Sequence, residues 1–180
     1  MRPLLVSSLF VGLLLLDACA GSQPVAGPRP VSFSARNRYD RQGRPRGRWR
    51  TYYADSAHAK LFTDGRYRHG RPIRMFSYYA PTGALDHTEK YGREGFCEVR
   101  YWHPGGQLAR LGHAQWLTGK KGARFYWFGP WTSFTEHGDT TALDLFVYGT
   151  QAQRITYDNG RRIAIETCDA AGRPQSSRKL

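Results

Sequence analysis

The chain has 180 residues, of which 40% are hydrophobic and 14% aromatic. That length suits one domain, and that composition excludes a chain that is disordered throughout. Lys and Arg outnumber Asp and Glu by 27 to 14, giving a formal charge of +13, which predicts attraction to anionic partners but says nothing of the fold.

The N-terminus predicts export. After Arg2, an apolar run from Leu4 to Leu16 is interrupted only by two serines, and it has the length of a signal-peptide core rather than of a membrane span. The run ends in Leu16-Asp17-Ala18-Cys19, which resembles the lipobox of bacterial lipoproteins. The resemblance implies a signal peptide over residues 1–18 and a lipid on the Cys19 thiol. It also implies attachment to a membrane of the cell envelope, at the periplasmic face or in the outer membrane.

Two other interpretations of this segment stay open. Ala18-Cys19-Ala20 is also a small-x-small site for ordinary signal peptidase, and cleavage there releases a soluble periplasmic or secreted protein without Cys19. An uncleaved apolar anchor is the other.

Gly, Pro and Ser define the ends of the expected domain. Residues 19–35 are rich in all three, which predicts a flexible tether from the membrane. Residues 170–180 have the same character and predict a disordered tail. The folded domain is therefore expected over residues 36–169.

Short aromatic-rich runs separated by glycines predict strands and turns. The runs are Trp49–Tyr53, Met75–Tyr79, Val99–Trp102, Arg124–Phe128 and Leu143–Tyr148. The turn signals are Asp64-Gly65, His69-Gly70, Thr82-Gly83, Gly105-Gly106, Thr118-Gly119, His137-Gly138 and Asn159-Gly160. Glycine supplies the positive φ that tight hairpins need. Few apolar residues recur at helical spacing, so the pattern predicts an all-β fold of successive antiparallel hairpins.

The hairpins also repeat one another. Tyr78 to Leu85 recurs 23 residues later as Tyr101 to Leu108, with the aromatic pair, Pro, Gly and Leu in place. Gly47-Arg-Trp49 recurs as Gly129-Pro-Trp131, and Tyr67-Arg-His-Gly70 as Tyr157-Asp-Asn-Gly160. These motifs resemble MORN-type repeats, specifically the bacterial variant often catalogued as a toxin–antitoxin system antitoxin component. The resemblance covers about residues 39–162, with 107–128 fitting poorly. It implies an elongated, single-layer antiparallel sheet and no catalytic residues.

Arginines form the main candidate binding surface. Arg44, Arg46, Arg48 and Arg50 alternate with other residues, so an extended chain places all four on one face. Further arginines follow in the next hairpin, namely Arg66, Arg68, Arg71 and Arg74. Guanidinium groups bind phosphate and carboxylate through two parallel hydrogen bonds. The alternative is the solvated face of a sheet in an arginine-rich protein.

Cys97 and Cys168 are the two cysteines other than Cys19. Outside the cytoplasm they can form a disulfide, closing a loop of about 70 residues and stabilising the fold by about 4 kcal/mol in the chain-entropy account. Two buried thiols that never meet are the alternative.

No residues predict catalysis, a metal or a cofactor. None of the six histidines has metal-ligand spacing; His69, His103 and His137 lie beside turn glycines. Four carboxylates could pair as acid and base, Glu136, Asp139, Asp144 and Asp158, but carboxylates in such repeats are usually solvated.

The leading hypothesis is a non-enzymatic, envelope-anchored lipoprotein that acts as a scaffold or binding module. Its expected partners are a protein or an anionic envelope component, not nucleic acid, and the hairpin edges allow end-to-end homo-oligomers. The alternatives are an antitoxin that binds a toxin, a soluble binder of anionic glycans or lipids, and a hydrolase of envelope glycans.

Overall fold

A computed structural model describes residues 37–53, 60–119 and 122–180. Three predictions concern residues outside these ranges: the signal peptide over residues 1–18, the lipid on Cys19 and the tether over residues 19–35. His58 also lies outside the described residues.

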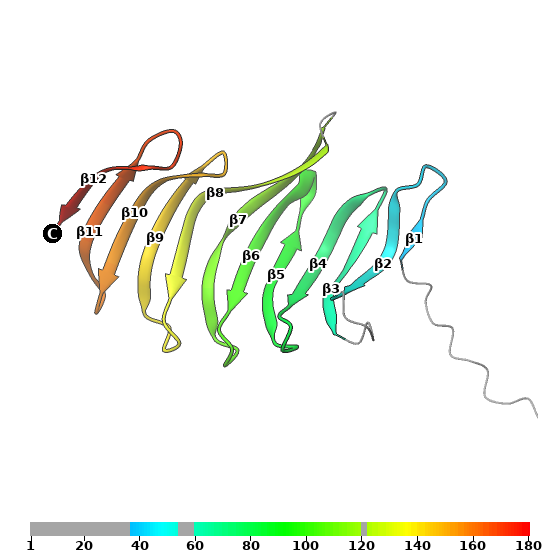
Figure 1. The fold of residues 1–180 in the computed structure, drawn as a ribbon, viewed down its shortest axis with the longest axis horizontal. Coiled ribbons are helices and arrows are strands. Elements are labelled where there is room, and N and C mark those ends of the chain that lie inside the picture. Colours follow the sequence, from blue (N-terminus) through cyan, green and yellow to red (C-terminus); the bar gives the residue numbers. More distant parts are fainter. Residues whose placement is uncertain (1–36, 54–59, 120–121) are drawn as a thin grey trace, which may run out of the picture. The chain divides into compact units, whose positions relative to one another are not determined.

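The described chain forms one antiparallel sheet of 12 strands in which the spatial order equals the order in sequence (Figure 1). The strands are β1 (Arg38–Tyr39), β2 (Pro45–Tyr52), β3 (Leu61–Arg68), β4 (Arg71–Tyr79), β5 (Leu85–Tyr91), β6 (Phe96–Trp102), β7 (Leu108–Gly119), β8 (Gly122–Phe134), β9 (Thr140–Val147), β10 (Thr150–Asp158), β11 (Arg161–Cys168) and β12 (Pro174–Lys179). Among the described residues the one helical segment is a short 3-10 turn, η1 (Arg93–Gly95). The prediction of an all-β sheet of successive hairpins is confirmed.

Five turns of the same kind join neighbouring strands. In each, the N–H of the first residue donates to the carbonyl of the fifth, and the N–H of a glycine at the fourth position donates to the carbonyl of the first. The turns span residues 40–44, 80–84, 103–107, 135–139 and 169–173. The second and third are the pair predicted from the 23-residue repeat, so the repeat marks a shared hairpin geometry.

Three hairpins turn through two residues, both with positive φ: His69-Gly70, Tyr148-Gly149 and Asn159-Gly160. This is the turn whose twist matches that of antiparallel strands. The likeness predicted between Tyr67–Gly70 and Tyr157–Gly160 therefore has a structural basis.

Gly65 was predicted to make a turn, and that prediction is wrong. It lies inside β3, opposite Trp49 of β2. A Cβ on Gly65 would lie 2.2 Å from the ring of Phe76, and one on Gly112 would lie 2.1 Å from the ring of Trp131. Both glycines therefore give an aromatic ring room to lie flat against the neighbouring strand.

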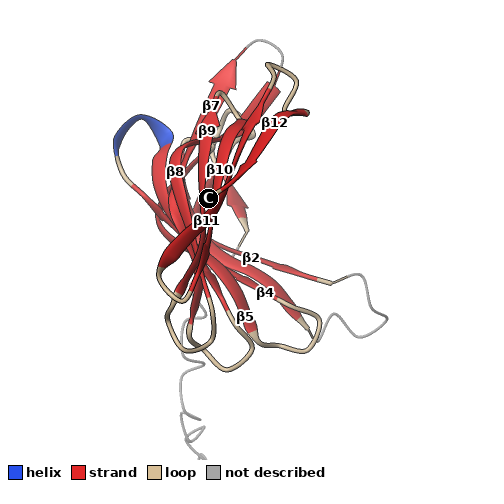
Figure 2. Cartoon of the chain, turned by 90° about the vertical axis from the view of Figure 1, so that its left-hand side faces the viewer, coloured by secondary structure: helices blue, strands red, loops and turns tan. Residues whose placement is uncertain are grey.

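The core lies on one side of the sheet, here called the aromatic face, and is formed by Phe76, Tyr91, Cys97, Val99, Ala114, Trp131 and Phe146. No second layer of the described chain covers these residues; instead, rings from successive strands cover one another. Tyr67 contacts Phe76 at 5.1 Å between ring centroids, and Phe76 contacts Tyr91 at 5.8 Å, both edge to face. Such pairs stabilise beyond the area they bury. The sheet also twists strongly along its length (Figure 2), as antiparallel sheets do.

The C-terminal tail also differs from expectation. The tail over residues 170–180 was predicted to be disordered, but Asp169 begins a fifth copy of the common turn and β12 pairs with β11. Residues 107–128 fit the repeats poorly because they form most of β7 and β8, which at 12 and 13 residues are the longest strands.

Candidate functional site

The side of β2, β3 and β4 opposite the aromatic face carries arginines and is called here the arginine face. It is formed by Arg46, Arg48 and Arg50 of β2, by Arg66 and Arg68 of β3, and by Arg71 and Arg74 of β4. Along β2 this is the arrangement that strand alternation predicts. Three arginine pairs lie directly opposite one another across neighbouring strands: Arg38 and Arg46, Arg48 and Arg66, and Arg68 and Arg71. Like charges in such positions destabilise a sheet. The facing guanidinium groups therefore repel one another, and a bound anion would reduce this repulsion.

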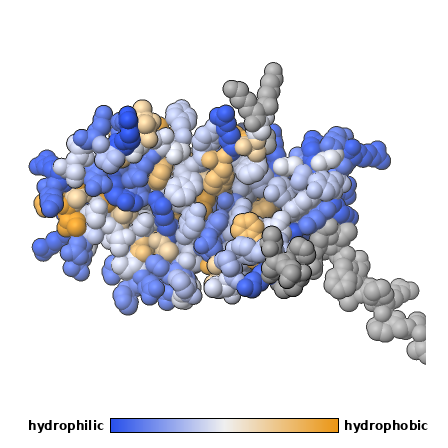
Figure 3. All heavy atoms as spheres, viewed as in Figure 1, coloured by the Kyte–Doolittle hydropathy of each residue, from blue (hydrophilic) through white to orange (hydrophobic). Residues whose placement is uncertain are grey.

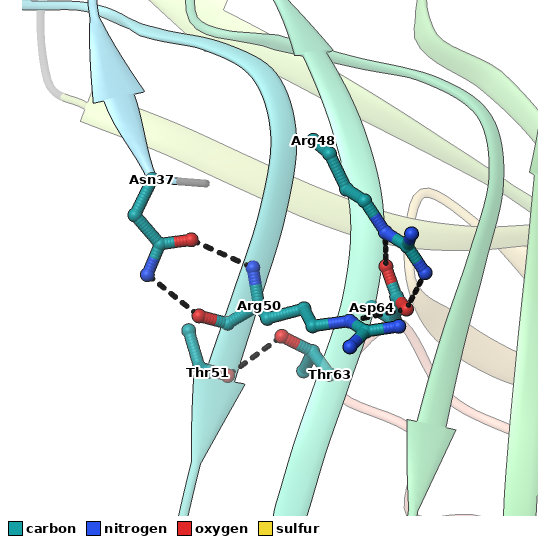
Figure 4. A network of polar contacts seen from close by, with 6 residues as sticks. All are labelled: Asn37, Arg48, Arg50, Thr51, Thr63 and Asp64. Carbon is teal, nitrogen blue, oxygen red and sulfur yellow. Dashed lines mark hydrogen bonds and ion pairs between the residues drawn. The ribbon is translucent and has the colours of Figure 1, made fainter. Parts of the chain in front are cut away.

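Asp64 is the one carboxylate of this face that binds arginines (Figure 4). Nε and Nη2 of Arg48 donate to its two oxygens at 3.0 and 2.6 Å, and Nε of Arg50 donates at 2.7 Å. Partial burial opposes ionisation of Asp64, but the hydrogen bonds and positive charge of Arg48 and Arg50 outweigh it and lower its pKa. One negative charge thus holds two positive ones, which leaves an excess of +1.

Neighbouring polar contacts hold this network in place (Figure 4). The side chain of Asn37 donates to the carbonyl of Arg50 and accepts from its N–H, both at 2.7 Å. On the other face, the hydroxyls of Thr51 and Thr63 lie 2.6 Å apart, and Thr63 is buried. The backbone that carries Arg50 is therefore bonded on both sides.

Arg44 lies in the turn between β1 and β2 and is bonded to residues of that turn and of the β3–β4 turn. Its side chain pairs with Asp40 at 2.9 Å and contacts Nδ1 of His69 at 3.3 Å. Desolvation raises the pKa of Asp40, but hydrogen bonds from the backbone and side chain of Arg44 outweigh it and lower that pKa to about 2. Arg44 is thus partly neutralised.

The other five predicted arginines have no carboxylate within ion-pairing distance in the described part of the chain: Arg46, Arg66, Arg68, Arg71 and Arg74. All five are exposed. Two hollows lie among them. One, of about 320 Å³, is lined by Arg48, Asp64, Arg66, Arg74, Met75 and Tyr79 among others. The other, of about 510 Å³, is lined by Arg44, Arg68, His69, Arg71 and Ile73. The structure thus brings six of the eight predicted arginines to two adjacent concave sites.

Asp144 is a second arginine-binding carboxylate, and its role was missed. It was expected to be solvated, yet it is 0% exposed. Arg110 donates to it at 2.7 Å, Arg154 at 2.7 and 3.1 Å, and the amide of Gln151 at 3.0 Å. The sequence signal was weak: a single acid inside the apolar run that forms β9.

Arg110 lies in an aromatic box on the aromatic face. Its guanidinium carbon is 4.8 Å from the ring centroid of Trp127, 5.1 Å from that of Trp131 and 5.8 Å from that of Phe146. Burial lowers the pKa of Arg110 although Asp144 favours the charged form. The site is filled by the protein's own cation, so it serves the fold.

Of the two alternatives left open for Cys97 and Cys168, the structure has the separate thiols and not the disulfide. Cys97 on β6 and Cys168 on β11 are both free thiols, and five strand spacings separate their strands in the sheet. At about 4.8 Å per spacing they are too far apart for the Cα separation below about 7 Å that a disulfide needs. Burial and the nearby charge of Glu89 raise the pKa of Cys97 to about 12, which makes it an unreactive thiol.

The histidines beside glycines lie in turns, as predicted. His69 and His137 are turn residues, and Nε2 of His103 lies 3.0 Å from the carbonyl oxygen of Phe134. His87 was not singled out; its ring stacks between Tyr78 and Tyr101, with centroids 4.1 and 4.8 Å away. Across the described ranges no three His, Cys, Asp or Glu side chains gather as metal ligands would.

The chain matches no model of a known protein family and no curated protein. Within residues 37–53, 60–119 and 122–180, no helix has the length and apolar character to cross a membrane.

Proposed function

We propose that the chain is a non-enzymatic binding module of the bacterial cell envelope that holds anionic groups on its arginine face. A lipid on Cys19 would tether it to the membrane, and the partner would be an anionic envelope component or a protein with an acidic surface. The proposal rests mainly on one observation, the arginine pairs that lie opposite one another on β1–β4.

Charge and geometry support phosphate or carboxylate as the group bound. Around the hollow between β2 and β4, Arg48, Arg66 and Arg74 face a single carboxylate, Asp64. A guanidinium donates two parallel hydrogen bonds to such an anion. A bound phosphate would also separate the cationic side chains of Arg48 and Arg66, which face each other across neighbouring strands.

The lipid that the lipobox resemblance implies is a diacylglyceryl group, and two acyl chains already give stable membrane attachment. In this proposal the arginine face adds a separate, polar contact with the anionic envelope component. Labelled fatty acid should enter the wild-type protein but not Cys19→Ser; label in both, or in neither, contradicts the anchor.

The arginine face is tested by two triple variants with the same net charge. Arg66→Glu/Arg68→Glu/Arg74→Glu removes unpaired arginines of β3 and β4, and Arg161→Glu/Arg162→Glu/Arg178→Glu removes exposed arginines of β11 and β12. Both are made in the mature chain, residues 19–180 with Cys19→Ser, so that neither a lipid nor the apolar run from Leu4 to Leu16 contributes, and are mixed with phosphatidylglycerol vesicles at several salt concentrations.

We expect the first variant to lose at least about tenfold in vesicle affinity, with a shallower salt dependence, because fewer anionic contacts form. The control should lose less than about threefold. Equal losses would mean that net charge alone drives binding and would contradict the proposal.

A further inference from the structure

Three hollows lie in a row across the strand ends, on the side of the sheet where the β3–β4 and β9–β10 turns lie. Together they are called here the edge groove. The first, of about 510 Å³, is the basic hollow beside β3 and β4. The second, of about 400 Å³, shares Arg71 and Ile73 with the first. The third, of about 500 Å³, shares Gln115 and Leu117 with the second. Each hollow therefore adjoins the next at shared side chains.

The short β5–β6 connection makes room for the middle of the groove. At η1 the chain turns back through Glu94 and Gly95, both with positive φ. A Cβ on Gly95 would lie 2.0 Å from the carbonyl oxygen of Trp116, so this connection lies tight against β7. By contrast, β7 and β8 continue well past it (Figure 1).

The groove lies largely on the side of the sheet that carries the arginine face. Strand register joins Arg66 to Ile73 on β4, and the row through Met75, Lys90, Glu98, His113 and Phe128 then crosses to β8 on the same side. The basic end of the groove is therefore an extension of the arginine face.

The two ends of the groove differ in chemistry. The basic end has Arg44, Arg68, His69 and Arg71. The far end is lined by Phe96, Gln115, Leu117, Tyr126, Phe128, Phe146, Val147 and Tyr148. Several of these apolar side chains are exposed: Phe96 at 43%, Leu117 at 43%, Val147 at 49% and Tyr148 at 89%. Apolar patches appear among the hydrophilic side chains in the space-filling view (Figure 3), and clustered exposed apolar residues mark binding surfaces.

We propose that the edge groove binds one anionic lipid molecule, with its phosphate or carboxylate head at Arg68 and Arg71 and its hydrocarbon chain against Leu117, Phe128 and Val147. This inference rests on the proposed function, because the head occupies part of the same basic surface. It adds the ligand class and the direction in which the ligand lies.

The length of the groove agrees with a lipid. From Arg71 on β4 to Val147 on β9 there are five strand spacings, which span about 24 Å at about 4.8 Å each. An extended phospholipid is about half of a bilayer, or roughly 20–22 Å.

An acidic peptide fits this groove less well. A peptide brings N–H and C=O groups that need hydrogen-bond partners. The free edges of β7 beyond Gln115 and of β8 before Gly129 run along the strands, whereas the groove runs across them, so a peptide lying in the groove could not pair along either edge. A hydrocarbon chain makes no such demand.

The direct test compares three ligands by calorimetry on the mature chain, residues 19–180 with Cys19→Ser: inorganic phosphate, octyl phosphate and dodecyl phosphate, the last two below the concentrations at which they form micelles. We expect affinity to rise from the first to the last. Octyl and dodecyl phosphate should differ by about 10- to 100-fold, as partial to nearly full burial of four methylenes implies.

Two double variants locate the chain-binding end. Leu117→Asn/Val147→Asn alters exposed residues of the groove, and Leu145→Asn/Ile163→Asn alters residues that are each 41% exposed and lie outside it. The first should weaken dodecyl phosphate at least about tenfold and leave inorganic phosphate unchanged, whereas the control should change neither.

Several results would contradict the proposal that the edge groove binds a lipid. Equal affinity for inorganic and dodecyl phosphate would refute it and leave the arginine face standing. Binding of anionic vesicles without binding of monomeric dodecyl phosphate would refute it in favour of contact with a bilayer surface. Failure to bind vesicles, phosphate and dodecyl phosphate alike would remove both proposals.

Discussion

Asp64 and Asp144 each hold two guanidinium groups, yet the two clusters lie in different surroundings. Asp144 is 0% exposed, and its partner Arg110 is enclosed by aromatic rings. Asp64 and its partners Arg48 and Arg50 keep side-chain exposures of 17%, 39% and 23%. Arg110 and Arg154 keep side-chain exposures of 24% and 42%, so the clusters differ in the burial of the carboxylate rather than of the arginines. Beside Asp64 there are also exposed arginines without carboxylate partners.

The comparison shows that the number of charges does not distinguish a binding site from a structural ion pair; surroundings do. A buried charge must be paired, because an unpaired one is costly. A half-exposed pair contributes little stability, but its neighbours remain available to a ligand. The comparison predicts that removing the Asp144 carboxylate mainly lowers stability, whereas removing the Asp64 carboxylate mainly changes binding.

The largest effect is expected from Asp144→Asn. The substitution keeps the shape but leaves Arg110 and Arg154 without their carboxylate, and breaking a buried ion pair costs about 3–5 kcal/mol. Urea unfolding should show this loss. A cost below about 1 kcal/mol would mean that the ion pairs of Asp144 do not stabilise the fold as described.

Gly112→Ala and Gly65→Ala test the ring-on-glycine contacts beside each cluster. A methyl group meets the ring of Trp131 or of Phe76 at 2.1 and 2.2 Å, and such overpacking costs about 1–3 kcal/mol. Gly119→Ala is the control, because its Cβ would meet nothing within 4 Å. Equal denaturation midpoints for all three variants would contradict the packing described.

Asp64→Asn should act mainly on binding. We expect a stability loss of at most about 1 kcal/mol, since the pair is partly exposed. Affinity for anionic vesicles should rise severalfold because Arg48 and Arg50 lose their own counter-charge. Weaker binding to phosphatidylglycerol vesicles would mean that Asp64 orders the arginines rather than competing with the ligand.

The smallest effect is a pH dependence at Asp64. Its pKa in the folded protein lies below the ordinary 3.8, because Arg48 and Arg50 outweigh desolvation. Its contribution to stability is therefore complete above about pH 4 and is lost as the pH falls through the folded-state value. The difference in urea midpoint between wild type and Asp64→Asn should shrink between pH 6 and pH 2.5; a difference that grows has the wrong sign.

Much of the fold was predictable because its signals are local. Glycines at turn positions and aromatic runs between them give hairpins in chain order, and the 23-residue repeat from Tyr78 to Tyr101 marks two equivalent turns. The turn predicted at Gly65 is wrong because sequence alone does not distinguish a glycine that makes room for a ring, here that of Phe76, from a glycine in a turn.

The candidate site was predictable only in part. Alternation along β2 placed Arg46, Arg48 and Arg50 on one face, as the structure has it. Pairing across strands depends on register, which the sequence alone did not reveal. The partnership of Asp144 with Arg110 spans 34 residues, and the separation of Cys97 from Cys168 also depends on the order of strands between them.

The central claim is that the arginine face, and not the Asp144 cluster, binds anions. The most direct measurement follows the arginine Nε–H signals by NMR as inorganic phosphate is added. The account predicts that the largest shifts belong to Arg66, Arg68 and Arg71, while Arg110 and Arg154 stay unchanged. Shifts spread evenly over all exposed arginines, or largest at Arg110, would contradict it.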